Sequence, residues 1–119
     1  MKEGNIIKNK SYLFAVRIIR LFQYLTTTQN EYILSKQLLR SGTSVGALVR
    51  EAEHSESNAD FIHKFAIAQK EINETIYWLE LLQTTDYISQ KEFDSIILDA
   101  NEVIKIITSI IKTSKLKNK

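Results

Sequence analysis

Two carboxylate–histidine pairs have the spacing that metal chemistry would need. Glu51 lies three positions before His54, and Asp60 lies three positions before His63. Each pair would share one helix face, as in di-iron bundles, where two such pairs join a glutamate from each of the other helices. Both pairs lie at one end of the same predicted hairpin, and residues 11–27 contain no carboxylate to complete the site. We therefore expect a solvated or salt-bridged helix end and no metal centre.

Other catalytic chemistry finds no support in the residue types. The chain has no cysteine, which excludes a cysteine nucleophile, a thiolate metal site and a disulfide framework. Serine, histidine and acidic residues show no arrangement suited to nucleophilic catalysis. We predict that the protein is not an enzyme, and we expect no cofactor and no small-molecule substrate.

A run of small residues lies inside a predicted helix, although each glycine there costs about 1 kcal/mol relative to alanine. A phosphate-binding loop is excluded because no lysine follows the glycines and no strand precedes them. We expect a helix-packing motif, in which small side chains let a second helix backbone approach closely. The residues of this motif are Ser41, Gly42, Thr43, Ser44, Gly46 and Ala47.

Apolar residues recur with helical spacing along most of the chain, which contains no proline. Ser89 and Glu92 form a capping box before the last apolar pattern, and Asn30 and Ser57 would cap two earlier helices. Short connections make consecutive helices antiparallel neighbours, so we predict an all-α, up-down-up-down four-helix bundle. The prediction is a single domain over residues 1–119, with helices at about 11–27, 31–56, 59–85 and 90–114 and flexible tails at 1–10 and 115–119.

The small net charge of +2 hides an uneven distribution along the chain. Residues 1–50 hold eight basic and two acidic side chains (+6), residues 51–102 hold three and twelve (−9), and residues 103–119 hold five lysines (+5). The first predicted helix is also apolar on almost every side, which indicates an interface. We expect a homo-oligomer in which the basic first half faces the acidic second half of a neighbouring copy, a contact that can close into a ring.

A second hypothesis is a nucleic-acid-binding accessory protein that contacts RNA or DNA phosphates through basic side chains. The N-terminus does not lead into a signal peptide, and two arginines interrupt the first apolar run, so we expect a cytoplasmic protein without membrane contact. The candidate nucleic-acid-binding residues are Lys8, Lys10, Arg17, Arg20, Arg40, Lys112, Lys115 and Lys117.

Several segments together resemble a known bacterial family. They are residues 37–47, 50–52, 60–62, 77–82 and 87–88, within a resemblance that extends from about Ser11 to Ile111. The family is the four-helix-bundle family whose founding members are encoded in intervening sequences of large-subunit ribosomal RNA genes. The resemblance implies homopentameric rings without catalytic residues. A related branch, the accessory protein of diversity-generating retroelements, partners a reverse transcriptase and binds nucleic acid, which implies the second hypothesis.

Two residues depart from the pattern of that family. Leu48 stands where relatives commonly carry an asparagine, and Asp86 stands where many have a glycine. The first departure argues against a polar role at residue 48. From the second we expect a less tight turn between the last two helices.

Overall fold

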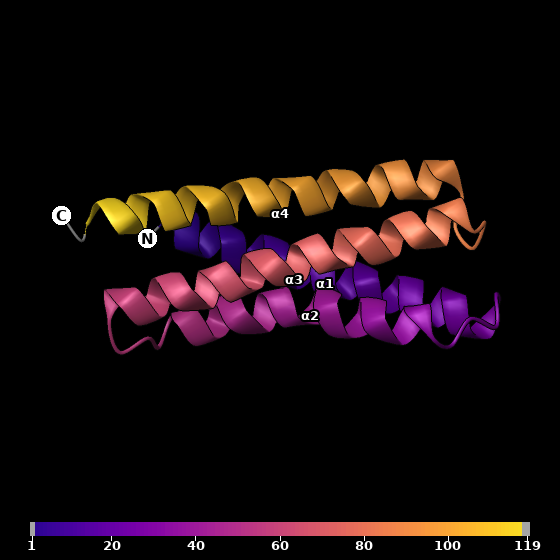
Figure 1. Cartoon of the computed structure of the whole chain (residues 1–119), viewed down its shortest axis with the longest axis horizontal. Coiled ribbons are helices and arrows are strands. Elements are labelled where there is room, and N and C mark those ends of the chain that lie inside the picture. Colours follow the sequence, from indigo (N-terminus) through magenta and orange to yellow (C-terminus); the bar gives the residue numbers. More distant parts are fainter. Residues whose placement is uncertain (1, 118–119) are drawn as a thin grey trace.

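Four antiparallel helices make up the structure, a computed structural model that describes residues 2–117. In chain order they are α1 (Lys2–Thr27), α2 (Leu34–Ala52), α3 (Asn58–Thr84) and α4 (Gln90–Leu116). Each helix packs against the next, and α4 closes the bundle by packing against α1 (Figure 1). The predicted all-α four-helix bundle is confirmed.

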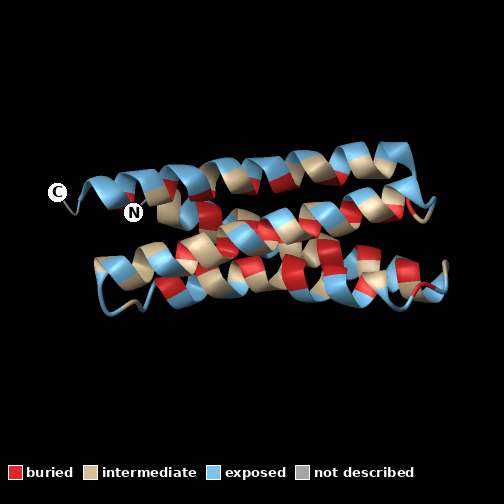
Figure 2. Cartoon of the chain, viewed as in Figure 1, coloured by how far each residue is buried: buried red, intermediate tan, exposed pale blue. Residues whose placement is uncertain are grey.

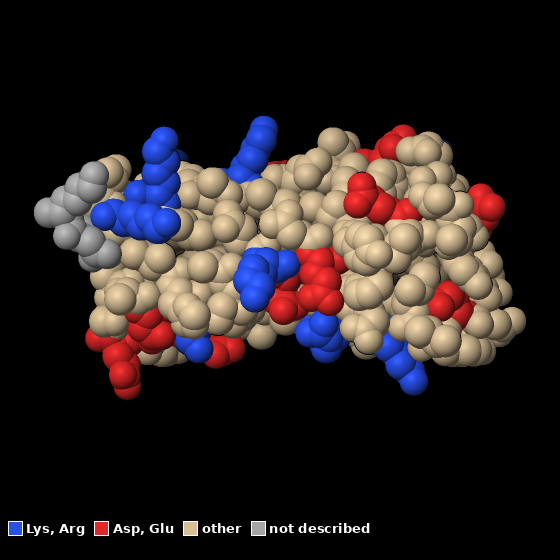
Figure 3. Space-filling model, in the orientation of Figure 1, with Lys and Arg blue, Asp and Glu red and all other residues tan. Residues whose placement is uncertain are grey.

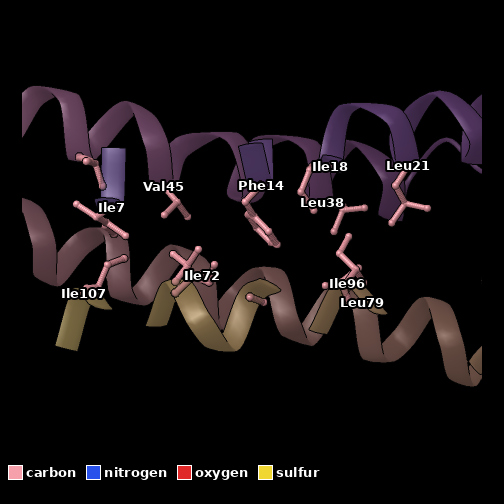
Figure 4. Packing of buried hydrophobic residues seen from close by; sticks show 14 of the residues in the cluster. Ile7, Phe14, Ile18, Leu21, Leu38, Val45, Ile72, Leu79, Ile96 and Ile107 are labelled. Atoms are coloured by element: carbon pink, nitrogen blue, oxygen red, sulfur yellow. The ribbon is translucent and has the colours of Figure 1, made fainter. Parts of the chain in front are cut away.

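One apolar stripe from each helix builds the core of the 50 × 22 × 19 Å bundle. The buried residues recur every three or four positions along each helix, whereas the outward positions are mostly exposed (Figure 2). Side chains from all four helices meet along the bundle axis in Figure 4, among them Ile7, Phe14, Val45, Ile72, Leu79, Ile96 and Ile107.

The starts of α3 and α4 follow the predicted capping residues. The Ser57 hydroxyl accepts a hydrogen bond from the Asp60 backbone N–H at 3.0 Å, and the Ser89 hydroxyl accepts one from Glu92 at 3.1 Å. Each serine thereby satisfies a backbone donor that the first helical turn leaves without an intrahelical partner.

Helix α2 is shorter than the predicted range of residues 31–56. It begins at Leu34, and Asn30 is not its cap: Asn30 adopts a left-handed φ of 54° in the turn. The cap is Glu31, whose carboxylate accepts three backbone N–H bonds, from Ile33 at 3.2 Å, Leu34 at 3.0 Å and Ser35 at 2.7 Å. The helix ends at Ala52 because the polar residues 53–57 bury no side chain and must reverse the chain before the Ser57 cap.

The prediction of flexible tails is wrong for the described part of both ends. Helix α1 begins at Lys2, because Ile7 is fully buried in the core and carries the preceding polar turn into the bundle. Helix α4 continues to Leu116, since buried Ser114 still packs against the bundle. Residues 1, 118 and 119 lie outside the described residues.

Candidate interaction surfaces

The outward side of α1 carries two apolar stripes. Ile6, Leu13 and Tyr24 share one line along the helix and are 37%, 55% and 42% exposed. Tyr12 and Ile19, seven residues apart, form a second line and are 54% and 40% exposed. We call these five residues, together with exposed Arg20, the α1 outer face. From Gly4 to Thr27 the sequence contains no acidic residue, so this face is apolar and cationic.

Most predicted basic candidates of the first half are neutralised within the chain. Lys8 pairs with Glu53 at 3.2 Å, and Lys10 pairs with Glu102. The basic first half therefore meets the acidic second half inside one molecule at these residues, and only basic side chains without such partners stay available to a neighbouring copy.

Two arginines extend this pattern over the middle of the bundle. Arg17 pairs with Asp99 at 2.7 Å, and Arg40 pairs with Glu74 at 2.9 Å. Lys8, Lys10, Arg17 and Arg40 thus lie against different partners on several sides of the bundle, and the structure does not bring them into one patch.

Most of the other basic side chains form no ion pair with the described residues. Arg20 forms no hydrogen bond or ion pair with them, and neither do four exposed lysines within residues 103–117. Figure 3 shows basic side chains over the C-terminal half of α4 and acidic side chains toward its N-terminal half, with a further acidic cluster at the lower left, below the lysines. These four, which we call the free lysines of α4, are Lys105, Lys112, Lys115 and Lys117. Lys2, Lys36, Lys70 and Lys91 are also exposed without an ion pair among the described residues, but they are spread over the other parts of the bundle.

Helices α1 and α4 are bridged by charged side chains and leave grooves between them. Arg17 donates hydrogen bonds to Asp99 at 2.7 Å and to the Ser95 hydroxyl at 2.6 Å. Beside this bridge lies a groove of about 510 Å³, lined by Arg17, Arg20, Leu21, Tyr24, Ile88, Ser89 and Glu92. Buried Leu21 and Ile88 contribute apolar lining, beside the charged side chains of Arg17, Arg20 and Glu92.

The small-residue motif serves two neighbouring helices. A Cβ on Gly42 would lie 2.8 Å from Ile18 Cγ1 of α1, and a Cβ on Gly46 would lie 3.4 Å from the Ser11 carbonyl oxygen. On the α3 side, a hydrogen bond of 2.9 Å joins Ser41 Oγ to Thr75 Oγ1. The motif therefore lies within the helix interfaces of the bundle.

The remaining motif residues are less enclosed. Ser44 donates a hydrogen bond to the Glu71 carboxylate of α3 at 3.1 Å, and Thr43 donates to the Leu39 carbonyl within α2 at 2.7 Å. Ala47 is exposed on the outward side of α2.

The carboxylate–histidine pairs are engaged elsewhere and do not converge. Glu51 forms an ion pair with Lys64 at 3.1 Å, and the Asp60 carboxylate accepts the Glu56 backbone N–H at 3.3 Å. His54 and His63 are exposed. Within residues 2–117, no group of three or more histidine, cysteine, aspartate or glutamate side chains is placed to hold a metal ion. In the same range, none of the helices is long and apolar enough to cross a membrane.

A sequence model of the 23S rRNA-intervening sequence protein family matches residues 3–109. The chain belongs to this family. The match covers all of α2 and α3 and most of α1 and α4, so the family pattern spans the whole bundle.

A solved structure of the family has the same architecture. It is the crystal structure of a protein of unknown function from the S23 ribosomal protein family of Bacteroides thetaiotaomicron. Its sequence is 54% identical, the two structures superimpose with a TM-score of 0.92, and the match covers 92% of this chain and 98% of the other. Among curated proteins, none matches the chain.

The two departures from the family pattern have different structural consequences. Leu48 is partly buried against the core, which suits an apolar side chain. Asp86 adopts a left-handed φ of 69°, the region that glycine tolerates best. The turn is nevertheless closed by hydrogen bonds from Asp86 N to Gln83 O at 3.1 Å and from Tyr87 N to Leu82 O at 2.9 Å. Asp86 therefore adopts the backbone conformation that a glycine would adopt, in a turn closed by hydrogen bonds.

Two exposed side chains of α4, Leu98 and Lys105, were not among the residues that the sequence singled out. Leu98 is 68% exposed. Lys105 joins the free lysines of α4, and Arg20 differs from Arg17 in having no acidic partner among residues 2–117. The helical period could have indicated that Leu98 is exposed, because Leu98 lies outside the buried stripe that Ile96, Ala100 and Val103 define.

Proposed function

We propose that this member of the 23S rRNA-intervening sequence protein family is a non-enzymatic, homo-oligomeric scaffold or interaction protein that self-associates through the α1 outer face. The observation that carries the proposal is the exposure of five large apolar side chains on one helix. Scattered apolar residues are normal on a protein surface, but aligned stripes mark interaction sites. The family resemblance implies five copies in the assembly.

Burial of the exposed apolar side chains of α1 would stabilise the association of two copies. Burying a large apolar side chain contributes roughly 1.5–3 kcal/mol relative to leaving it exposed. Partial burial of several such side chains in each copy offsets a substantial part of the cost of association. A copy of the same chain is the partner that is always present at matching concentration, so the proposal names the chain itself as the occupant.

The non-enzymatic part of the proposal rests on the distribution of reactive groups. Nucleophiles and titratable side chains do not converge in the described residues, and buried Ser41 and Thr75 bond to each other between helices. The buried carboxylate of Glu31 serves as a helix cap. The two hydroxyl groups join neighbouring helices and the carboxylate stabilises a helix start, so each has a structural role that involves no substrate.

Light scattering after size exclusion, applied to matched variants, tests self-association through α1. Leu13→Lys places a charge in one apolar stripe and should weaken association by about tenfold or more. Ile33→Lys is the control, because Ile33 is 77% exposed beside α2 and outside the α1 outer face. Association that both variants weaken equally, or that neither variant weakens, would contradict the role of α1.

A second candidate function is supported by the free lysines of α4. We propose as the alternative that the C-terminal part of α4 contacts the phosphates of RNA or DNA. Residues 103–117 contain four lysines and no acidic residue, and these lysines form no ion pairs with the described residues. Repeating this patch around an oligomer would multiply the contacts available to one nucleic acid.

Retention of RNA and of structured DNA at several salt concentrations tests the alternative. Changing Lys112, Lys115 and Lys117 to glutamine should reduce binding and flatten its salt dependence, because fewer counterions are released. The control changes three other exposed lysines, Lys36, Lys70 and Lys91, and thus removes the same total charge. Equal loss in both triple variants would show a nonspecific charge effect and contradict a site on α4.

A further inference from the structure

The arrangement of α1 and α4 points to a specific pairing of copies. We infer that α1 of one copy packs along α4 of the next copy, with the two copies running in the same direction, and that Leu13 and Arg20 face Leu98 and Asp94 of the neighbour. The inference rests on the proposed self-association and adds its surfaces, direction and register.

The register comes from contacts inside one chain. Glu3 accepts a hydrogen bond from Ser109, Lys10 pairs with Glu102, and Arg17 donates to Ser95. Each step of seven residues along α1 therefore matches a step of seven along α4 in the opposite direction. We call two residues at the same height along the bundle axis residues of the same level. Two copies that run in the same direction, side by side, place α1 of one and α4 of the other at the same levels as within one chain.

The same levels bring matching side chains together between copies. Leu13 lies between the levels of Ser95 and Glu102, where Leu98 is the most exposed apolar residue of α4. Arg20 lies at the level of residue 92, where the first turns of α4 expose Asp94 two positions away and Lys91 one position away, beside the half-buried Glu92. A same-direction contact thus sets leucine opposite leucine and brings Arg20 to a segment with two carboxylates and one lysine.

Charge favours α4 over a second α1 as the partner of the α1 outer face. The α1 outer face carries Arg20 and no acidic residue, so a second α1 would supply no counter-charge to Arg20. By contrast, residues 90–102 of α4 hold one basic and four acidic side chains. Asp94 bonds only to Gln90 among the described residues, at 2.7 Å, so its negative charge stays available to Arg20 of a neighbour.

The charges along α4 also favour neighbouring copies that run in the same direction over copies that run in opposite directions. The acidic part of α4 lies at the bundle end where α1 finishes, and the lysines lie at the end where α1 begins. A neighbour in the opposite direction would place the part of α4 that carries Lys105 and Lys112 near Arg20. Like charges across an interface suppress that alternative, whereas the same-direction contact is complementary.

Because the chain has no cysteine, disulfide trapping gives a clean test. Leu13→Cys and Leu98→Cys variants are prepared separately, mixed and mildly oxidised. The inference predicts a disulfide-linked heterodimer, because cross-linking requires Cα atoms within about 7 Å. The matched control replaces Leu98→Cys by Ser109→Cys, which introduces a cysteine on a similar side of α4 at a different level.

Each outcome has a defined meaning. A cross-link between residues 13 and 98, with none between 13 and 109, supports the pairing. A stronger cross-link to residue 109, or a homodimer of Leu13→Cys alone, overturns the register or the choice of α4. Oligomers that persist without any cross-link overturn the inference and leave the proposed function standing, whereas a monomeric unmodified chain refutes the proposed function itself.

Charge exchange gives a second test that introduces no cysteine. Arg20→Asp and Asp94→Arg should each weaken association by about fivefold, and the double variant should recover most of the loss. Circular dichroism confirms that each variant is folded. Losses that simply add in the double variant would contradict direct pairing of the two residues.

Discussion

Gly42 of α2 lies directly against Ile18 of α1, so closely that a Cβ on residue 42 would be 2.8 Å from both Cγ1 and Cγ2 of the isoleucine. Ile18 is fully buried and branched at Cβ, so it has little freedom to move aside. This contact explains why a glycine persists inside a helix despite its unfavourable helix propensity.

The Gly42→Ala variant should be less stable than the parent protein. The steric conflict costs about 1–3 kcal/mol, and the gain in helix propensity of about 1 kcal/mol offsets only part of it. The Gly46→Ala control meets the Ser11 carbonyl oxygen at 3.4 Å, an ordinary contact, and should be neutral or stabilising. Urea unfolding of the three proteins measures the difference, and a Gly42→Ala variant as stable as Gly46→Ala would contradict the packing account.

Replacing Glu31 should destabilise the start of α2 in a pH-dependent way. Burial alone would raise the pKa of the Glu31 carboxyl, but the backbone N–H groups of Leu34, Ser35 and Ile33 and the Ser35 hydroxyl hold it below the ordinary value of 4.5. The stabilisation is therefore present above that ordinary value and is lost as the pH falls through the lowered pKa.

Glu31→Gln should consequently cost about 1–2 kcal/mol at neutral pH, with a smaller difference from the parent near pH 3. Exposed Glu56→Gln is the control and should change little. Urea unfolding at both pH values gives the comparison. A deficit for Glu31→Gln that is the same at both would argue against an ionised cap.

Changing Asp86 to glycine should stabilise the turn between α3 and α4. The left-handed φ of 69° strains an aspartate and not a glycine, so we expect a gain of about 0.5–1 kcal/mol. Asp86→Ala keeps a Cβ and should give no such gain. Thermal unfolding compares the variants, and equal effects of glycine and alanine would show that backbone strain is not the cause.

The hydrogen bond between Ser41 and Thr75 should contribute to the α2–α3 interface. Both residues are fully buried, so Thr75→Val deprives the Ser41 hydroxyl of one partner and should cost about 1–2 kcal/mol. The Ser41→Ala/Thr75→Val double variant should lose less than the two single changes added together. Strict additivity in urea unfolding would indicate that the two hydroxyls do not interact.

Periodicity and capping made most of the fold predictable. Ser57 and Ser89 lie directly before apolar patterns of helical period, so the starts of α3 and α4 could be placed within a residue. The first turns of α1 could not be foreseen, because Lys2–Asn5 is polar and only tertiary burial of Ile7 makes that segment part of the helix. Glu31 was missed as a cap because its role depends on the left-handed turn at Asn30.

The interaction surfaces were predictable only in part. The apolar character of residues 12–25 indicated an interface, but the sequence alone did not show which side of this helix would face the core and which would stay exposed. The charge sorting was visible as well, yet Arg17 and Asp99 are 82 positions apart, and nothing local to either residue reveals that they meet within one chain. Charge partners depend on the closure of α4 onto α1, which is a tertiary event.

The mass of the unmodified chain in solution tests the central claim most directly. Sedimentation equilibrium over a range of roughly micromolar concentrations, at low and high salt, separates a monomer from an assembly. The account predicts a multiple of 13.8 kDa that persists on dilution and loosens at high salt. A single species of 13.8 kDa at every concentration and salt level would contradict self-association through α1.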